Sequence, residues 1–551
     1  MKKLKLTALA LGLSVIFTAC NHDTNPSFNE RDKVLTISSE MDFEIDKVYD
    51  TSNLKGKKAF IAVTNLSEDD QEVRKHTESV IKNNPNLDLI RTGGYLNIPY
   101  EPPRKNFSVK NFNDTGAAYN FSQSNTRSLA INDTKDFYAV DTNNNISTEI
   151  AKDAVLKAIG NHCNVWYVTK DGITVADAAL QTLADTFDNI FECETYLFGS
   201  NIPTITYNGL ITVDENTKVN IIVYDLKGDY LTTKETGGGT FGYFTSNDFI
   251  LNDPQSAPFS NESECLHIDS YFLEMYPDSI RSTIAHEFQH LLHFVNKTLH
   301  QGLNINDNGQ ASFIYSDTWF NEMLSMVCED IMQTQLGLKD ADSPKSRLSL
   351  FNYAYELGFT TWRTGDDVYY SYANAYAFGA FLLRNFGIDF IKELASNEYI
   401  DKESITQALI KYSNDPEVKS FDQVLSKFYN VVMNPKGTSY TLNKSVTRTY
   451  EDVGGDKTVT FNCSAINLFD YLTLSAKYMN SNYNFITNWY EAKENTDYYG
   501  PYIFNDRYYY TLAPSGMFVS FAGVIKYDTY KFSSQYFNTS DTLKYKIILV
   551  D

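Results

Sequence analysis

Hydrophobic and polar positions alternate along this chain with two different periods. Short apolar runs bounded by Asn, Asp, Gly and Ser, such as residues 59–63, predict β-strands. Apolar residues at helical spacing predict helices over the segments 148–156, 175–191, 280–295 and 319–332. The chain is therefore predicted to be an α+β protein.

The two patterns divide the chain into three predicted regions. Residues 36–147 carry mainly strand patterns, residues 148–440 contain the predicted helices, and strand patterns return in residues 441–551. The composition also favours extensive β-structure, because 39 Tyr and 36 Phe stand beside only 4 Trp. We predict a β-rich N-terminal region, a central domain and a sandwich-like C-terminal β-domain.

The first residues resemble the leader of a bacterial lipoprotein. A basic start and a short apolar run end at Cys20, which predicts a signal peptide over 1–19, lipidation of Cys20 and a flexible tether over 20–35. The predicted location is the bacterial cell envelope, at the outer membrane or cell surface, with the lipid as the only membrane contact. Phe17 stands where leucine is commoner, so secretion without lipid is the alternative.

The net charge bears on nucleic-acid binding, and the cysteine spacing bears on the role of the thiols. The chain has 47 Lys and Arg against 69 Asp and Glu, a net charge of −22, without a large basic cluster. Such a surface repels polyanions, which disfavours nucleic-acid binding. Apart from Cys20, the cysteines are odd in number and show no zinc-knuckle spacing, so they are predicted to be core thiols.

Residues 304–309 echo the first part of a calcium-binding loop. The segment begins with Asn304 instead of Asp, and Tyr315 stands where the loop requires a bidentate Glu. We therefore interpret the segment as a plain turn. Binding of Ca²⁺ elsewhere on the acidic surface stays open, without a motif to support it.

The segment His286-Glu287-Phe288-Gln289-His290 carries the clearest chemistry, because it has the pattern H-E-x-x-H inside a predicted helix. Residues four apart on a helix lie about 40° apart around its axis, so two imidazoles can face one metal ion. Glu287 is then placed beside that metal as a general base. The bare pattern also occurs in unrelated helices, where it is only a polar stripe.

A catalytic zinc site needs a third protein ligand. A metzincin would have glycine and histidine three and six residues after His290, where this chain has His293 and Asn296. His293 lies too far along the same helix to converge easily on one ion, so we interpret it mainly as a packing or hydrogen-bonding residue. Glu322, in the next predicted helix, is the better candidate for the third ligand.

A peptidase also needs a donor for the oxyanion of its tetrahedral intermediate. No histidine follows His300, so tyrosine is the natural donor. Tyr372 and Tyr376, four residues apart in an aromatic segment, are the two candidates.

Taken together, these motifs resemble the hyicolysin-type zinc metallopeptidases, within the wider group of gluzincins that use a glutamate as third ligand. The resemblance covers about residues 160–435 and rests on the segments Gly242-Tyr243-Phe244, Ser260-Asn261-Glu262, Ile284-Ala285-His286-Glu287-Phe288-Gln289-His290 and Trp319-Phe320-Asn321-Glu322.

The resemblance implies a zincin-like catalytic domain in which His286, His290 and Glu322 hold one Zn²⁺ and Glu287 activates the zinc-bound water. It also favours Tyr376 over Tyr372, because Tyr376 begins a Tyr-x-x-Gly segment similar to that of related aminopeptidases.

One departure from the relatives affects the expected activity. Met326 stands where several relatives have an acidic residue behind the metal, and Ser325 is the candidate to orient a histidine in its place.

The sequence therefore predicts a zinc-dependent metallopeptidase that acts on a protein or peptide substrate. The alternative is a catalytically inactive zincin-fold lipoprotein that serves as a binding protein or adhesin. Cleavage specificity, natural substrate and oligomeric state are not indicated by any pattern in the chain.

Overall fold

A computed structural model of the chain describes the following residues: 35–36, 40–72, 107–108, 129–140, 146–147, 149–169, 173–226, 240–252, 259–433, 439–468, 484–485, 498–499, 511–531 and 540–550. The predicted signal peptide, Cys20 and nearly all of the predicted tether lie outside these residues. None of the described helices has the length and apolar content needed to cross a membrane.

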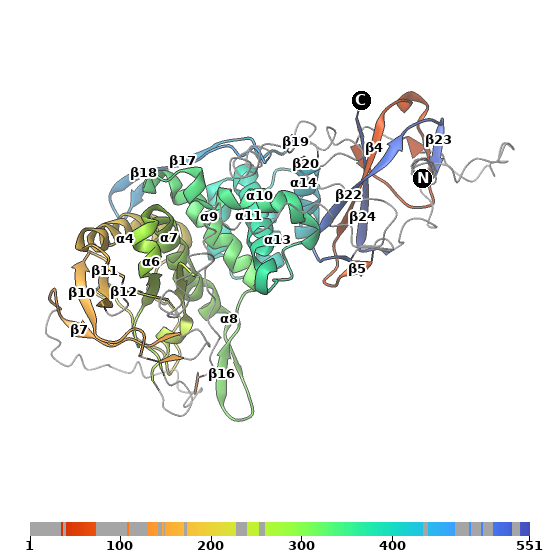
Figure 1. Cartoon of the computed structure of the whole chain (residues 1–551). Coiled ribbons are helices and arrows are strands. Elements are labelled where there is room, and N and C mark those ends of the chain that lie inside the picture. The colour runs from red at the N-terminus through yellow and green to blue at the C-terminus, as the bar shows by residue number, and fades with distance from the viewer. Residues whose placement is uncertain are drawn as a thin grey trace, which may run out of the picture.

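A six-stranded sheet forms the base of the central domain (Figure 1). Its strands, in spatial order, are β13 (Gly242–Phe244), β14 (Cys265–Asp269), β12 (Val219–Tyr224), β11 (Cys163–Tyr167), β10 (Ala154–Ile159) and β7 (Thr134–Lys135). The three middle strands β14, β12 and β11 are parallel and completely buried, whereas β13 and β10 pair antiparallel with their neighbours. Strand β13 is thus the edge strand at one side of the sheet.

The helix predicted over 148–156 is wrong, because residues 149–153 form bends and a turn and the residues from Ala154 onward form a strand. Residues Ala154–Ile159 form strand β10, in which side chains alternate between buried and partly exposed. This alternation allows β10 to pair with β11 and to bury one of its faces in the core. The local sequence pattern did not indicate that β11 is available as a pairing partner.

Helices pack in sequence from the sheet outward. Helices α4 and α7 lie on the sheet, α9 packs on α7, and α11 packs on α9. The helices of this domain are α4 (Asp177–Phe198), α6 (Ser270–Met275), α7 (Pro277–His293), α8 (Leu299–Gln301), α9 (Thr318–Leu336), α10 (Leu348–Ala354), α11 (Val368–Phe386), α12 (Ile388–Ser396), α13 (Asp401–Tyr412) and α14 (Phe421–Met433). The helices predicted over 175–191, 280–295 and 319–332 are confirmed, as is the α+β class.

The start and end of α7 follow from its sequence. Pro277 occupies the first turn, where its missing N–H costs nothing, and Asp278 complements the positive end of the helix dipole. At the other end α7 continues into a π-helical turn, Phe294–Thr298. A short hairpin of β15 (Leu303–Ile305) and β16 (Gln310–Phe313) then leads to α9, and the segment with the calcium-like pattern is the turn of this hairpin.

Strands from both terminal regions share a second sheet (Figure 1). Its order is β2 (Glu40–Asp42), β24 (Leu543–Val550), β4 (Lys58–Asn65) and β22 (Met517–Val524). Strand β4 pairs with β24 on one edge and with β22 on the other. A smaller sheet joins β1 (Leu35–Thr36), β3 (Val48–Asp50) and β23 (Thr529–Lys531) in a similar way. The predicted N-terminal region and C-terminal β-domain are therefore interleaved.

The hairpin of β17 (Val446–Val453) and β18 (Lys457–Cys463) packs instead on α9. The remaining short strands are β5 (Gln71–Glu72), β6 (Phe107–Ser108), β8 (Ala139–Val140), β9 (Ile146–Ser147), β19 (Asn484–Phe485), β20 (Tyr498–Tyr499) and β21 (Thr511–Leu512). The five cysteines after Cys20 are all buried free thiols, as predicted.

A fully buried ion pair ties α9, α11 and the segment after β18 together. The Arg384 guanidinium binds both carboxylate oxygens of Asp330, and its Nη2 donates to the carbonyl oxygen of Ser464 at 2.7 Å. Burial alone would raise the pKa of Asp330, but the charges of Arg384 and Lys345 and a hydrogen bond from Tyr376 hold it below its usual value.

We expect Asp330→Asn to destabilise the protein by about 3–5 kcal/mol near neutral pH, because it leaves Arg384 buried without its counter-charge. Because the pKa of Asp330 is lowered in the folded state, its stabilising contribution is present above the unfolded value near 3.8 and is lost as the pH falls through the folded value. Denaturant unfolding of both proteins checks this. The exposed Asp456→Asn is the control, and equal stability of all three proteins at neutral pH would contradict the expectation.

Candidate metal centre

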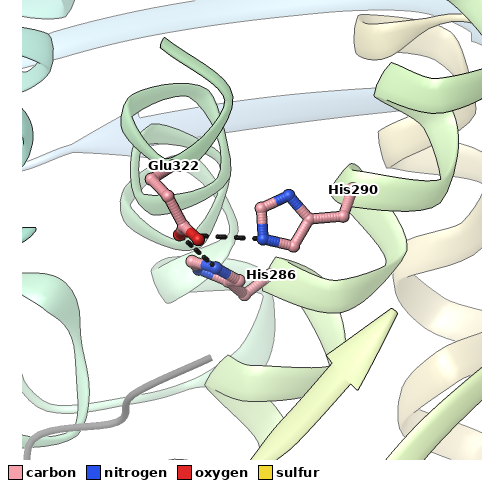
Figure 2. A group of neighbouring side chains, drawn as sticks. All are labelled: His286, His290 and Glu322. Carbon is pink, nitrogen blue, oxygen red and sulfur yellow. Dashed lines mark hydrogen bonds and ion pairs between the residues drawn. The ribbon is translucent and has the colours of Figure 1, made fainter. Parts of the chain in front are cut away.

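Two neighbouring helices bring three metal-ligating side chains together in the interior. His286 and His290 extend from α7, and Glu322 extends toward them from α9 (Figure 2). The Oε2 atom of Glu322 is 3.1 Å from Nε2 of His286 and 3.7 Å from Nε2 of His290. Three candidate ligand atoms, one from each residue, lie within 4.8 Å of one another, and all three residues are buried. The residues predicted as ligands are thus neighbours in the fold.

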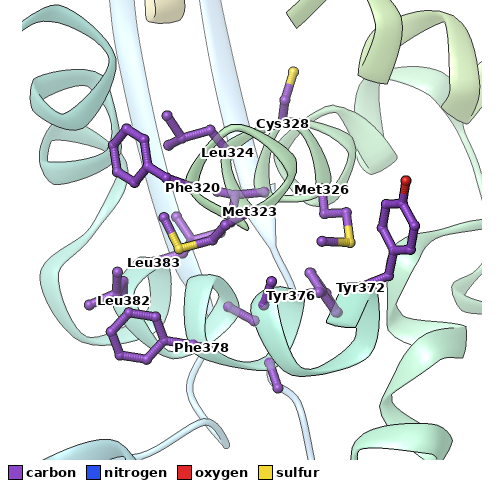
Figure 3. Packing of buried hydrophobic residues seen from close by; sticks show 14 of the residues in the cluster. Phe320, Met323, Leu324, Met326, Cys328, Tyr372, Tyr376, Phe378, Leu382 and Leu383 are labelled. Atoms are coloured by element: carbon purple, nitrogen blue, oxygen red, sulfur yellow. The ribbon is translucent and has the colours of Figure 1, made fainter. Parts of the chain in front are cut away.

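Close helix packing holds Glu322 in this position. Helix α9 lies between α7 and α11. Apolar side chains of α9 and α11 pack against one another where these two helices meet (Figure 3). Gly379 of α11 permits this approach, because a Cβ atom there would lie only 2.7 Å from side-chain atoms of Met323 and Val327. A larger residue at this position would push α9, and with it Glu322, out of place.

Hydrogen bonds orient both imidazole rings. The Nδ1–H of His286 donates to Oε1 of Glu329 at 2.7 Å, and the hydroxyl of Ser282 donates to the other oxygen of Glu329 at 2.6 Å. The Nδ1 of His290 is 3.1 Å from Oδ1 of Asn321. Because a carboxylate and an amide oxygen only accept hydrogen bonds, each ring carries a proton on Nδ1 and turns its Nε2 toward Glu322.

Glu329 is a site residue that the sequence analysis missed. It lies seven residues after Glu322, two turns farther along the same face of α9, and this spacing was the available signal. Met326, at the position where several relatives have an acidic residue, is fully buried in the core. The role expected for Ser325 agrees with its hydroxyl lying 3.0 Å from Nδ1 of His290.

The carboxylate of Glu287 lies beside the three ligands in an unusual environment. It is fully buried, and neither of its oxygens has a side-chain hydrogen-bond partner within the described part of the chain. Burial raises its pKa to about 8, although the backbone N–H of Phe244 and the charge of His286 act in the opposite direction. A buried acid of this kind is costly unless a ligand or reactant uses it.

Strand β13 runs past this carboxylate at close range. A Cβ atom on Gly242 would lie 3.2 Å from Cγ of Glu287 and 2.9 Å from Cγ2 of Thr283. Glycine therefore allows the edge strand of the sheet to lie directly beside α7 at the site.

The protonation of the two histidines fits a cation site. Burial lowers the pKa of His290 to about 4, which keeps its ring neutral. Burial also acts to lower the pKa of His286, but hydrogen bonds to Glu322 and Glu329 outweigh it and raise the value to about 10. The protonated ring of His286 thus lies between two carboxylates, and a divalent cation would replace the proton between Nε2 and Glu322. Two imidazoles and one carboxylate are a typical donor set for zinc.

The structure separates the two candidate tyrosines. The hydroxyl of Tyr372 donates to Oε1 of Glu322 at 3.3 Å, whereas the hydroxyl of Tyr376 donates to Asp330 at 3.0 Å within the buried ion pair. Tyr372 therefore lies at the metal centre and Tyr376 lies away from it. His293 hydrogen-bonds to Ser316 through Nε2 at 2.8 Å and is outside the group of three ligands.

We expect Glu329→Gln to weaken zinc binding by about 10-fold to 100-fold, because an amide orients His286 less strongly than a carboxylate does. Competition between the metal-free protein and a zinc-binding dye measures this affinity. Glu393→Gln, which removes a carboxylate from a surface ion pair with Lys411, is the matched control. An unchanged zinc affinity in Glu329→Gln would show that the charge of Glu329 does not affect zinc binding.

Comparison with known proteins agrees with this geometry. Residues 153–439 match the sequence model of the peptidase M30 family. The chain is also 28% identical over 311 residues to the neutral metalloprotease ShpI of Staphylococcus hyicus, an alignment that covers 54% of this chain and 62% of that protein. The chain thus spans less than two thirds of the length of this relative. Because the family match covers more than half of the chain, the protein belongs to the peptidase M30 family, as its resemblance to the hyicolysin-type enzymes predicted.

Proposed function

We propose that this protein is a zinc-dependent metallopeptidase that hydrolyses peptide bonds in protein or peptide substrates. The observation that carries the proposal is the buried group of His286, His290 and Glu322 beside the unpartnered carboxylate of Glu287. Membership of the peptidase M30 family and similarity to a neutral metalloprotease support the same activity.

His286, His290 and Glu322 would hold the zinc ion. When bound, zinc supplies a Lewis acid that polarises the scissile carbonyl and makes a water molecule more acidic. Glu329, Asn321 and the hydroxyl of Ser325 would keep the two imidazole rings in the orientation that ligation requires.

Glu287 would act as the general base and then as the general acid. Its unpaired oxygens are free to accept the proton of the attacking water and to deliver it to the leaving amine. The raised pKa favours the second step. A carboxylic acid with this pKa still holds a proton near neutral pH and can donate it to the amine, whereas an ordinary glutamate is ionised there and has no proton to donate.

Tyr372 would stabilise the oxyanion. Its hydroxyl already lies beside Glu322, and a small rotation of the ring would turn the O–H from this carboxylate toward the substrate oxygen. Tyr376 is not suited to this role, because its hydroxyl is engaged with Asp330.

Strand β13 is the proposed place for the substrate backbone. Within the described sheet it pairs only with β14, and its Phe244 N–H faces Glu287 on the other side. An extended peptide could add to this edge by main-chain hydrogen bonds, which would bring its scissile bond to the metal centre.

We prefer a peptidase to an inactive binding protein because the ligands, base and oxyanion donor are all present in one buried site. We also propose attachment to the cell envelope through Cys20. The support for this attachment is the leader-like sequence before the cysteine.

We expect Glu287→Gln to lower kcat by about 10²-fold to 10⁴-fold while one zinc stays bound per chain, because it removes the proton carrier but no ligand. Casein hydrolysis together with metal analysis checks this, and a zinc chelator should abolish the activity of the parent until zinc is restored. The exposed Glu274→Gln serves as control. Persistent hydrolysis by Glu287→Gln would refute the assignment.

The two tyrosines should behave differently. Tyr372→Phe should lower kcat by about 10²-fold to 10³-fold with little change in stability, because it removes the oxyanion donor. Tyr376→Phe should retain kcat and lose about 1 kcal/mol or more of stability, because it removes a hydrogen bond to the buried Asp330. Steady-state kinetics and thermal unfolding of both variants distinguish these outcomes, and the reverse pattern would assign the role to Tyr376.

A further inference from the structure

Arg347 is a buried cation close to the metal centre. It ends the short 3-10 helix η6 (Pro344–Arg347) that precedes α10, and only 2% of its surface is exposed. Taking a guanidinium out of water is costly, so a buried arginine requires compensating partners. Its partners connect it to the proposed catalytic groups.

The first of these partners is the ring of Tyr372. The guanidinium carbon of Arg347 lies 4.9 Å from the centre of this ring, a typical cation–π distance. Trp362 packs edge-on against the same ring, with 4.8 Å between ring centres and 83° between the planes. Contacts to a planar cation and a large aromatic side chain restrict how this ring can move.

The second partner is the carboxylate of Glu329. Arg347, Glu329 and Ser282 line the same small cavity of about 10 Å³, which is roughly the space for one water molecule. Burial lowers the pKa of Arg347, and the negative charges of Glu329 and Glu322 act against this lowering. Arg347 therefore stays charged beside both carboxylates.

The buried carboxylates explain why a cation is needed there. Glu322 and Glu329 are both buried, and the negative charge of each stabilises the charged form of Arg347. Without Arg347, these carboxylates would leave more negative charge where the oxyanion must form.

We propose that Arg347 is a positioning residue that holds Tyr372 in place as the oxyanion donor. The inference rests on the proposed peptidase function and adds a residue to it. Arg347 acts through the tyrosine ring, over which its guanidinium lies.

A neighbouring cation offers a matched control. Lys345 lies two residues earlier in the same turn and is equally buried, but its Nζ donates to Gln333 at 2.5 Å and to Ser464 at 2.6 Å. Lys345→Met therefore removes one buried charge from the same segment without touching Tyr372. It should lower stability and leave kcat near that of the parent.

The test is a double-mutant cycle on the full chain. Arg347→Met should lower kcat by about 10-fold to 100-fold with a small change in KM, because a displaced donor no longer meets the oxyanion. The same substitution in a Tyr372→Phe background should cause no further loss, since the group that Arg347 positions is already absent. Arg347→Lys keeps the charge without the planar group and should recover part of the loss.

The outcomes separate this inference from the proposed function. Effects of Arg347→Met and Tyr372→Phe that multiply, or a normal kcat in Arg347→Met, would overturn the role of Arg347 while the peptidase assignment stands. Failure of the parent to cleave any peptide would instead refute the proposed function.

A crystal structure of metal-free Arg347→Lys or Arg347→Met tests the positioning without activity. The hydroxyl of Tyr372 should leave Oε1 of Glu322 while His286 and His290 keep their places. An unmoved tyrosine would contradict the proposal.

Discussion

The whole site depends on the packing of α7 against α9. Helix α7 carries two imidazoles one turn apart, and α9 supplies both the carboxylate in front of them and the carboxylate behind His286. Neither helix could hold a metal ion alone, because each provides an incomplete set of donors. The apolar contacts that press α9 between α7 and α11 therefore set the distances on which any ligation depends.

This packing also concentrates negative charge in the interior. Three glutamates lie within one buried region, and each has a different neighbour: Glu329 is hydrogen-bonded to a histidine and a serine, Glu322 to a histidine and a tyrosine, and Glu287 to no described side chain. The same residue type thus serves in three different ways according to its surroundings. A cation is the simplest way to make such a region stable.

The predictions from the sequence were most specific where they rested on the spacing of residues within one helix. The spacing of His286, Glu287 and His290 predicted two metal ligands and the general base. The apolar pattern around Glu322 predicted that it lies on the next helix. The resemblance favoured Tyr376 over Tyr372, and the helical spacing gave no means to check that choice, because two residues one turn apart share a helix face. Only the packing of α9 on α11 directs one hydroxyl to Glu322 and the other to Asp330.

The pairing of strands that are far apart in the sequence could not be predicted from local sequence patterns. The strand patterns at 59–63 and 543–550 were visible, but no local period shows that β4 and β24 lie side by side. In a chain made from its N-terminus, β4 is made before the whole central domain, and its partners β22 and β24 are made after that domain. Its two edges must therefore stay unpaired until β22 and β24 have been made, so this sheet closes around a central domain that can already have folded.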